Sequence, residues 1–298
     1  MAETETTTPT PPAPTPAPPP ATPPAKRPPP KMPTKTTAPA AAPAAKTAFT
    51  LERGVTRTSW KLGIYGPEGI GKSSLAALCP GIAFCDLELS TLDLDITRVK
   101  GVNTGDYVTS WANLRRWVQG LSSGIYAIDS VTRAEDWCAA WVVKNKKSNE
   151  GAAASDSLED FRYKAGLTFV VDEFRRFLSD IENAFVRGAS FVMLAHNRIS
   201  RIKNPDGSDF IRNEPRLIDD PKASNMLQWV QFLDHLAFVD LDKAVNKQGK
   251  VSGSGSRTIF LDTAPNRISK TRSLPKDPME FLEGSTTLWE LLGVPAAE

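Results

Sequence analysis

Several kinds of residue are scarce in this sequence of 298 residues, and each scarcity excludes a class of protein. The three cysteines (Cys79, Cys85 and Cys138) form no metal-type pair, and their odd number argues against a disulfide framework. With only two histidines, His196 and His235, the composition does not support a zinc site. No apolar run approaches the roughly 18–20 residues of a membrane helix, and a net charge of +2 is too small to indicate a nucleic-acid binder by itself. We therefore expect a protein of the reducing cytoplasm that makes no membrane contact.

Aromatic residues are missing from the first 47 positions, which instead hold sixteen of the 25 prolines among Thr and Ala. Such a composition cannot bury enough apolar surface to offset the entropy lost on ordering. We expect residues 1–47 to form a disordered tail, partly in polyproline-II conformation, and not a secretory signal, because the segment has no apolar core stretch. The tail is either a docking segment for a protein partner or a solubilising leader. Residues 48–298 are then available for one α/β domain.

One stretch has the composition of a phosphate-binding loop. An apolar run at 60–65 precedes it, and a segment able to start a helix, 74–78, follows it. This order of strand, glycine loop and helix distinguishes a real phosphate-binding loop from a chance match. Glycines let backbone N–H groups curl around an anion, while the lysine would reach the β- and γ-phosphates and the first serine would hold Mg²⁺. We expect a nucleoside triphosphate, taken as ATP, and Mg²⁺ to bind here, with nucleotide contacts from Gly66, Pro67, Glu68, Gly69, Ile70, Gly71, Lys72, Ser73 and Ser74.

Apolar runs alternate with helical periodicity along the rest of the chain. We predict strands at 60–65, 82–88, 125–130, 190–196, 235–241 and 258–262, and helices at 110–119, 134–144, 167–187, 221–231 and 278–292. Between them, 144–157 is predicted to be a mobile loop and 198–215 a polar, basic excursion around a turn at 204–207. Because strands alternate with helices, we predict an α/β fold with a mostly parallel sheet flanked by helices and the phosphate loop at its carboxyl edge.

Acidic side chains are predicted at the tips of two of these strands. Asp129 ends an apolar run, where a phosphate-loop protein needs a carboxylate for Mg²⁺. The next residue is Ser130 rather than Glu, which disfavours AAA+-type motors, where the catalytic glutamate directly follows the metal aspartate. Glu88 ends the strand after the phosphate-loop helix, and in a parallel sheet this tip faces the same crevice. We predict Ser73 and Asp129 as the metal residues and Glu88 as the base, with Asp86 as the competing carboxylate.

A set of short segments resembles, as a whole, phage-encoded AAA-family ATP-binding proteins with a RecA-like core, which are relatives of recombinases associated with single-strand annealing. These segments are the phosphate loop, Asp86-Leu87-Glu88, Ile125–Asp129, Leu194-Ala195-His196 and a terminal Lys-Thr-Arg, and the resemblance covers about Trp60 to Lys276. It implies that Glu88 polarises the attacking water and that His196 senses the γ-phosphate and passes the signal to a DNA-contacting loop. With Lys72, these two residues form the predicted catalytic set.

The loop that follows His196 is basic, and the resemblance implies a contact with single-stranded DNA. We predict that contact for Arg198, Arg201, Lys203 and Arg212, through the phosphate charges. A solvated hairpin is the alternative. The chain departs from the family here, because this loop is only weakly basic, and also at the tail, which is not part of the shared core.

A second basic segment, Asn266–Arg272, follows the last predicted strand. In RecA-like rings and filaments, basic residues in this region reach a neighbour's nucleotide as trans-acting fingers. Lys270 and Arg272 match that location in order along the chain, so a homo-oligomer is expected. The alternative is a basic surface strand, which predicts ATPase activity without concentration dependence.

These features lead to one primary prediction and two alternatives. The primary prediction is a RecA-like core that binds and hydrolyses Mg·ATP, coupled to single-stranded DNA in phage-type recombination or replication. The first alternative is a small-molecule or nucleotide kinase, in which 198–216 would serve as an arginine-rich lid. The second is a non-catalytic, nucleotide-dependent assembly factor whose tail docks a partner.

Overall fold

The protein is described by a computed structural model that covers residues 53–54, 58–101, 105–147, 156–161, 165–204, 207–245 and 251–295. The predicted tail, residues 1–47, lies outside the described residues, as do positions 148–155 of the predicted loop. Residues 55–298 form one compact unit. In its described part, no helix combines the length and the apolar character needed to cross a membrane.

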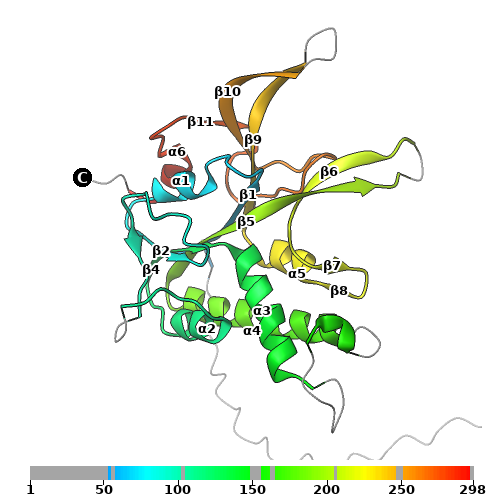
Figure 1. Cartoon of the computed structure of the whole chain (residues 1–298). Helices are drawn as coiled ribbons and strands as arrows, with labels where there is room; N and C mark the ends of the chain where they lie inside the picture. The colour runs from blue at the N-terminus through cyan, green and yellow to red at the C-terminus, as the bar shows by residue number, and fades with distance from the viewer. Residues whose placement is uncertain are drawn as a thin grey trace, which may run out of the picture. The chain divides into compact units, whose positions relative to one another are not determined.

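A nine-stranded sheet of described residues forms the centre of this unit, with the strand order β11-β10-β9-β1-β5-β4-β2-β3 and β6 paired to β5 outside that row (Figure 1). The strands are β1 (Lys61–Gly66), β2 (Ile82–Asp86), β3 (Thr97–Arg98), β4 (Gly124–Asp129), β5 (Ala189–Ile202), β6 (Phe210–Pro215), β9 (His235–Val245), β10 (Val251–Phe260) and β11 (Met279–Phe281). The strands from β9 to β3 pair in parallel, whereas β10, β11 and β6 add antiparallel partners. The predicted α/β fold with a mostly parallel sheet is therefore confirmed.

Helices cover both faces of the sheet. They are α1 (Lys72–Ala77), α2 (Trp111–Gln119), α3 (Val131–Asn145), α4 (Ala165–Val186), α5 (Asn225–Phe232) and α6 (Thr287–Leu291), with a 3-10 turn, η1, at Leu158–Asp160. Side chains of α2, α3, α4 and α5 pack on one face, and those of α1 and α6 pack on the other. Serine side chains cap the N-termini of α2, α3 and α5 by accepting a backbone N–H, which explains why these helices begin where they do.

The alternation of side chains along β5 divides the core into two layers. Phe191 and Met193 join the cluster under α2–α5, while Val192 and Leu194 join the cluster under α1 and α6. Both faces are covered, so the strand is a continuous apolar run rather than an alternating one. This is why the apolar runs of the sequence identify the central strands so well.

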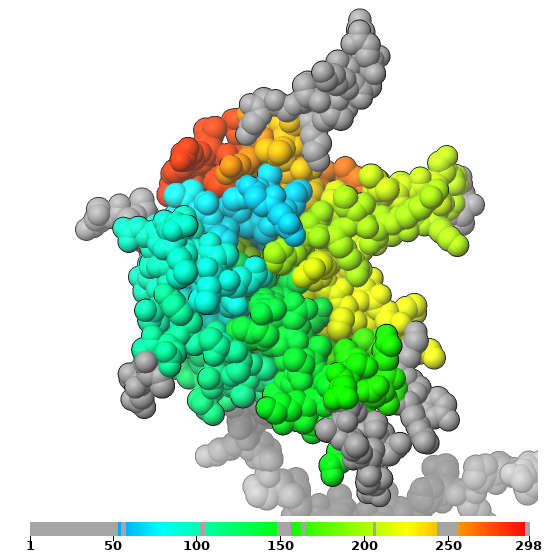
Figure 2. Space-filling view, in the orientation of Figure 1, coloured from blue at the N-terminus to red at the C-terminus, as the bar shows by residue number. Residues whose placement is uncertain are grey.

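Several segments differ from the prediction. The strand predicted at 258–262 is β10, which begins at Val251 and ends at Phe260. The excursion at 198–215 is a β-hairpin, because β5 runs on past His196 to Ile202 and pairs with β6. The helix predicted at 221–231 begins only at Asn225, after the two-residue strands β7 (Asp219–Asp220) and β8 (Ala223–Ser224). The helix predicted at 278–292 is wrong in its first half: 279–281 is β11, paired with β10, and the helix α6 begins after Gly284, whose φ of 78° interrupts a helix. The β5–β6 hairpin projects from the packed body, as Figure 2 shows in yellow-green.

Candidate functional site

The phosphate-binding loop lies between the end of β1 and the start of α1. A side chain at Gly66 has no room, because a Cβ there would lie 2.2 Å from the carbonyl oxygen of Val239 on β9. Gly69 and Gly71 have φ angles of 71° and 92°, a conformation that L-residues with a side chain adopt only with strain. All three positions thus need glycine, which is the residue that the motif places there.

Lys72 lies across this loop. Its Nζ donates hydrogen bonds to the carbonyl oxygens of Gly66 and Pro67, at 3.1 and 3.0 Å. The pKa of Lys72 is lowered, chiefly by burial, although the nearby carboxylates of Asp129, Glu68 and Glu88 act to raise it. The ammonium group of Lys72 is therefore held against the backbone of the phosphate loop.

The two predicted metal residues meet directly. Ser73 donates a hydrogen bond from Oγ to Oδ2 of Asp129 at 2.6 Å, although the two residues come from α1 and the tip of β4. Asp129 is 5% exposed, and this burial raises its pKa to about 6, while the bond from Ser73 lowers it. A hydroxyl and a carboxylate beside a phosphate loop are the protein ligands that Mg²⁺ uses with nucleotides. The donor set therefore fits the metal.

The two competing carboxylates at the end of β2 have different surroundings. Asp86 accepts hydrogen bonds from the backbone N–H groups of Glu88, Ser90 and Thr91 and from the Thr91 hydroxyl, so it closes the turn after β2. Glu88 instead turns its Oε1 toward Ser130, which donates a hydrogen bond to it from the hydroxyl. Asp86 thus binds the backbone of its own turn, whereas Glu88 binds Ser130, the residue that follows Asp129.

His196 completes the group. Its Nε2 lies 2.8 Å from Oε1 of Glu88, and because a carboxylate only accepts, the histidine donates. This hydrogen bond is the main reason that the pKa of Glu88 is lowered, so Glu88 is ionised at neutral pH. His196 pairs in register with Gly66 across β1 and β5, which places it beside the phosphate loop. Its Nδ1 lies 3.9 Å from Oε1 of Glu68 in that loop.

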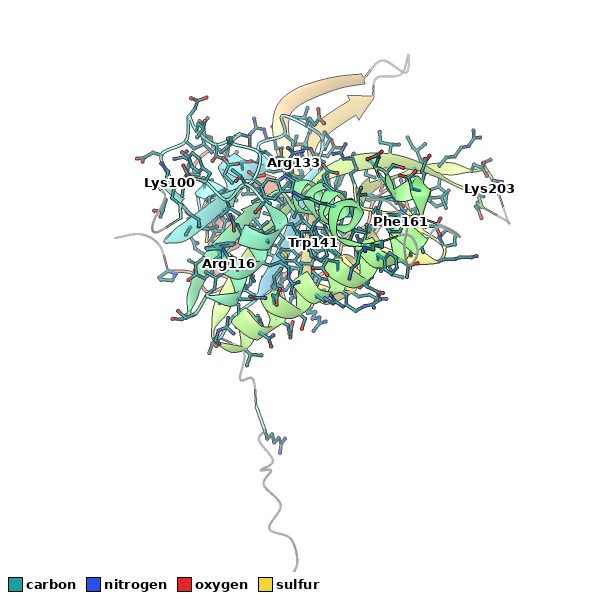
Figure 3. All side chains as sticks on the ribbon, turned by 60° about the horizontal axis from the view of Figure 1, so that its bottom comes forward. Lys100, Arg116, Arg133, Trp141, Phe161 and Lys203 are labelled. Atoms are coloured by element: carbon teal, nitrogen blue, oxygen red, sulfur yellow. The ribbon has the colours of Figure 1, made fainter. Side chains whose placement is uncertain are left out.

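The cations predicted to contact DNA lie on the β5–β6 hairpin, and most of them are in ion pairs. Arg198 and Arg212 both bind Glu214, at 3.0 and 2.5 Å, and Arg198 also binds Asp219 at 2.9 Å. Arg201 pairs with Asp209 at 3.1 Å. Lys203 is exposed near the end of the hairpin, away from the body of the protein (Figure 3). The hairpin therefore neutralises much of its own positive charge.

Lys270 and Arg272 lie far from the phosphate loop of their own chain. Lys270 pairs with Leu236, which is in register with Gly63 in the middle of β1. Arg272 lies 3.5 Å from Asp234, whose carboxylate also accepts the backbone N–H of Lys61, the first residue of β1. Both cations are thus toward the amino end of the strands, opposite the phosphate loop.

Two residues beside the phosphate loop escaped the sequence analysis. Arg257 of β10 lies so close to Gly71 that a Cβ there would be 2.6 Å from its Nη1, and its guanidinium lies 5.5 Å from the ring of Phe281 on β11. Both line a cavity of about 810 Å³ that also reaches Ser74 and Ala77 on α1. They belong to no motif, and only the pairing of distant strands brings them to the loop, so the sequence gives no local signal for them.

Comparison with known proteins gives one family. A family model described as an AAA domain matches residues 58–273. No curated protein matches the chain. Among solved structures, a KaiC-like protein from the hyperthermophilic archaeon Pyrococcus horikoshii OT3 aligns with 75% of this chain and 90% of its own length, at 12% sequence identity and a TM-score of 0.37.

Proposed function

The chain belongs to the AAA-domain family of P-loop proteins, which implies nucleotide binding and hydrolysis, and we propose from this premise that it is a Mg²⁺-dependent ATPase. The observation that carries the proposal is the convergence of the phosphate loop, Ser73, Asp129, Glu88 and His196 at the carboxyl ends of adjacent parallel strands. Ser73 and Asp129 lie 2.6 Å apart, and Glu88 and His196 lie 2.8 Å apart. Ligands of α/β sheets bind at this edge.

Each residue has a distinct part in the proposed reaction. The loop N–H groups and Lys72 bind the β- and γ-phosphates, and Ser73 and Asp129 hold the metal. Magnesium supplies charge neutralisation on the phosphate oxygens when it is bound. Glu88, ionised and fixed by Ser130 and His196, accepts a hydrogen bond from the attacking water and orients it. His196 donates either to Glu88 or to a phosphate oxygen, so it can report whether the γ-phosphate is present.

The cavity beside Gly71 is the proposed place for the nucleoside half of ATP. Its lining residues Arg257 and Phe281 lie against Gly71 of the phosphate loop, and they offer a guanidinium and a ring to a flat base. The loop fixes where the phosphates lie, and the base would then extend along α1. This placement makes β10 and β11 part of the nucleotide site.

ATP turnover by the full chain and three variants tests the proposal. Lys72→Ala is expected to lose nucleotide binding or hydrolysis, whereas Glu88→Gln binds ATP but turns it over about 10²- to 10⁴-fold more slowly, as general-base losses do. Arg257→Ala is expected to raise the KM for ATP with little change in kcat. Glu290→Gln, which alters an exposed carboxylate on α6, serves as the matched control. Normal turnover by Glu88→Gln would remove the base assignment.

We also propose that the ATPase is coupled to single-stranded DNA through the β5–β6 hairpin, in recombination or replication of the phage type. Support comes from the continuity of β5, which leads from His196 into the hairpin without a break, and from the exposed Lys203. The ion pairs of Arg198, Arg201 and Arg212 count against strong phosphate binding. Turnover that rises with single-stranded DNA supports the coupling. A phosphorylated acceptor would instead indicate the kinase, and negligible turnover would indicate the assembly factor.

Homo-oligomerisation and a tail partner complete the proposal. Lys270 and Arg272 are proposed as trans-acting fingers, supported by their place at the end of the strands away from their own phosphate loop. The proline-rich tail, residues 1–47, is proposed to dock a protein partner, and its composition alone supports this.

A further inference from the structure

A second cavity, of about 500 Å³, lies directly beside the catalytic candidates. Glu88 and His196 form one side of it, and the first turns of α3 form another. The remaining walls come from the turn after β2, from residues 108–109, and from the residue that follows β6, Arg216. This cavity is separate from the one beside Gly71, since the two share no lining residue.

Two arginines without ion-pair partners give this cavity a positive wall. Among the described residues, neither Arg133 nor Arg216 has a carboxylate within 4.0 Å, in contrast to the paired arginines of the β5–β6 hairpin. Asp136 lines the same cavity and is exposed. An anion that enters would therefore meet two guanidinium groups outside any ion pair, which favour phosphate, beside the carboxylates of Glu88 and Asp136.

The cavity is also lined by large apolar side chains. Trp137 is half-buried there, with the guanidinium of Arg133 5.8 Å from its ring. Leu89 is 44% exposed and has a φ of 54°, a conformation that is rare for a residue with a branched side chain. Such strain is found where the surrounding structure holds a residue for a purpose, as at ligand contacts. An indole and a leucine provide a surface on which a flat ring can stack.

The backbone connects this cavity to the catalytic pair. The N–H of Arg133 donates to Oγ of Ser130, whose hydroxyl in turn donates to Glu88. The N–H of Arg216 donates to the carbonyl oxygen of His196 at 2.8 Å. A ligand that draws Arg133 and Arg216 together would therefore shift the two groups bonded to their backbone, the Ser130 hydroxyl and the His196 carbonyl, and with them Glu88 and His196.

We propose that this cavity binds a nucleoside monophosphate unit, either free or as one residue of a single strand, and that its occupancy sets the position of Glu88. The phosphate lies between Arg133 and Arg216, and the base stacks on Trp137. Asp136 and Thr109 face the edge of the base, where a nucleobase carries hydrogen-bond donors and acceptors. The phenyl ring of a phosphotyrosine, the other flat phosphorylated group, lacks them. An arginine or lysine from a second copy does not suit the site, because its positive charge would meet those of Arg133 and Arg216. The regulatory part of the inference rests on the proposed ATPase, while the binding part does not.

Binding to the full chain without ATP tests the site. The probes are a fluorescein-labelled oligo-dT of twelve nucleotides, followed by anisotropy, and free dTMP and dAMP, followed by quenching of tryptophan fluorescence. The double variant Arg133→Gln/Arg216→Gln is expected to bind at least tenfold more weakly, with a lower salt dependence. Trp137→Leu is expected to lose about five- to 100-fold, as stacked bases do. Arg116→Gln alters an exposed arginine that does not line the cavity (it is labelled in Figure 3) and is the charge control, and thermal melting verifies that each variant folds.

Each outcome decides the inference. Tighter binding of the oligonucleotide than of the mononucleotides assigns the unit to a strand, and equal binding assigns it to a free nucleotide. The inference is overturned if no probe binds, if a phosphotyrosine peptide binds in their place, or if Arg116→Gln loses as much as the double variant. Because ATP is absent, these failures leave the proposed ATPase untouched. The regulatory part fails if saturating ligand changes ATP turnover equally in the wild-type protein and in the double variant.

Discussion

The side-chain carboxyl group of Glu135 on α3 is buried in the folded protein. It is 6% exposed, and it accepts hydrogen bonds from the backbone N–H of Ile218 and from Nδ2 of Asn225. Burial outweighs these bonds and raises its pKa from 4.5 to about 7. The folded protein therefore keeps this proton over a pH range in which the unfolded chain has already lost it.

This shift predicts a specific pH dependence of stability. A raised pKa in the folded state contributes stability that is fully present below the unfolded value and is lost as the pH rises through about 7. The lost contribution is on the order of 3 kcal/mol, at about 1.4 kcal/mol for each pKa unit. Glu135→Gln keeps an oxygen acceptor but cannot ionise, so its free energy of unfolding should fall less than that of the wild-type protein between pH 5 and 8. Urea unfolding at both values measures the difference, and parallel changes in the two proteins would contradict the assignment.

Single residues also show which features of the candidate site can be predicted from the sequence alone. The meeting of Ser73 and Asp129 could be predicted, because the phosphate loop and the acid both lie at the carboxyl ends of strands in one parallel sheet. The sequence already favours Glu88 over Asp86 as the base, and the structure adds what each binds: Asp86 the local backbone and Thr91, and Glu88 the side chains of Ser130 and His196. Ion pairs such as Arg198 with Glu214 could not be predicted from charge counts, because they depend on the register of β5 and β6.

At the scale of elements, the apolar strands were predictable because both faces of the sheet are covered. Helix α4 was equally clear, predicted at 167–187 and found at Ala165–Val186. The segment 279–281 was predicted as helix but is strand β11, because pairing with β10 supplies backbone partners that local propensity does not register. The length of β5 was missed for a similar reason, since its polar second half is stabilised by β6 rather than by burial.

The hydroxyl of Tyr65 ties the hairpin to the sheet. This residue of β1 lies within hydrogen-bonding distance of the carbonyl oxygens of Asn213 and Ile268, at 3.1 and 2.6 Å, and accepts the N–H of Ile268 at 3.0 Å. The pKa of the phenol is raised by burial, so it remains a donor at any ordinary pH. One side chain thus joins β1, the base of β6 and the segment before Lys270.

Tyr65→Phe is expected to weaken this junction. The change removes the hydroxyl partner of the part-buried Ile268 carbonyl oxygen, while the N–H of Ile268 keeps its bond to the carbonyl oxygen of Asn213, so the expected cost is about 1 kcal/mol of unfolding free energy. Tyr126→Phe is the matched control, because its hydroxyl makes only an exposed 3.4 Å bond to the carbonyl oxygen of Ser123. Urea unfolding measures both, and hydrogen exchange at Asn213 and Ile268 should accelerate in the first variant only. Equal stability of the two variants would show that the junction contributes nothing.

At the scale of the whole molecule, the strand order separates two sets of cations. Strand β9 pairs with β1 although about 170 residues lie between them, and this long-range pairing positions Lys270 and Arg272. A sequence pattern cannot specify such a partner, because any apolar strand would satisfy the same burial. The pairing matters for function, since the phosphate loop and the two cations come to lie toward opposite ends of β1. The proposed catalytic role of these two cations therefore involves the nucleotide of a second copy.

Mixing two inactive variants tests this requirement. Lys72→Ala lacks a working phosphate loop but keeps Arg272, whereas Arg272→Gln keeps the loop and is expected to lose at least tenfold in turnover, as trans-acting fingers do. In a random mixed assembly, about one interface in four joins an intact loop to an intact finger, so the mixture should recover roughly a quarter of wild-type turnover. Lys276→Gln, an exposed cation nearby, should remain fully active, and the turnover per wild-type subunit should rise with protein concentration. If Arg272→Gln is as active as the wild-type protein, or if the mixture gives only the sum of its parts, the segment is a basic surface strand and the active unit is a single chain.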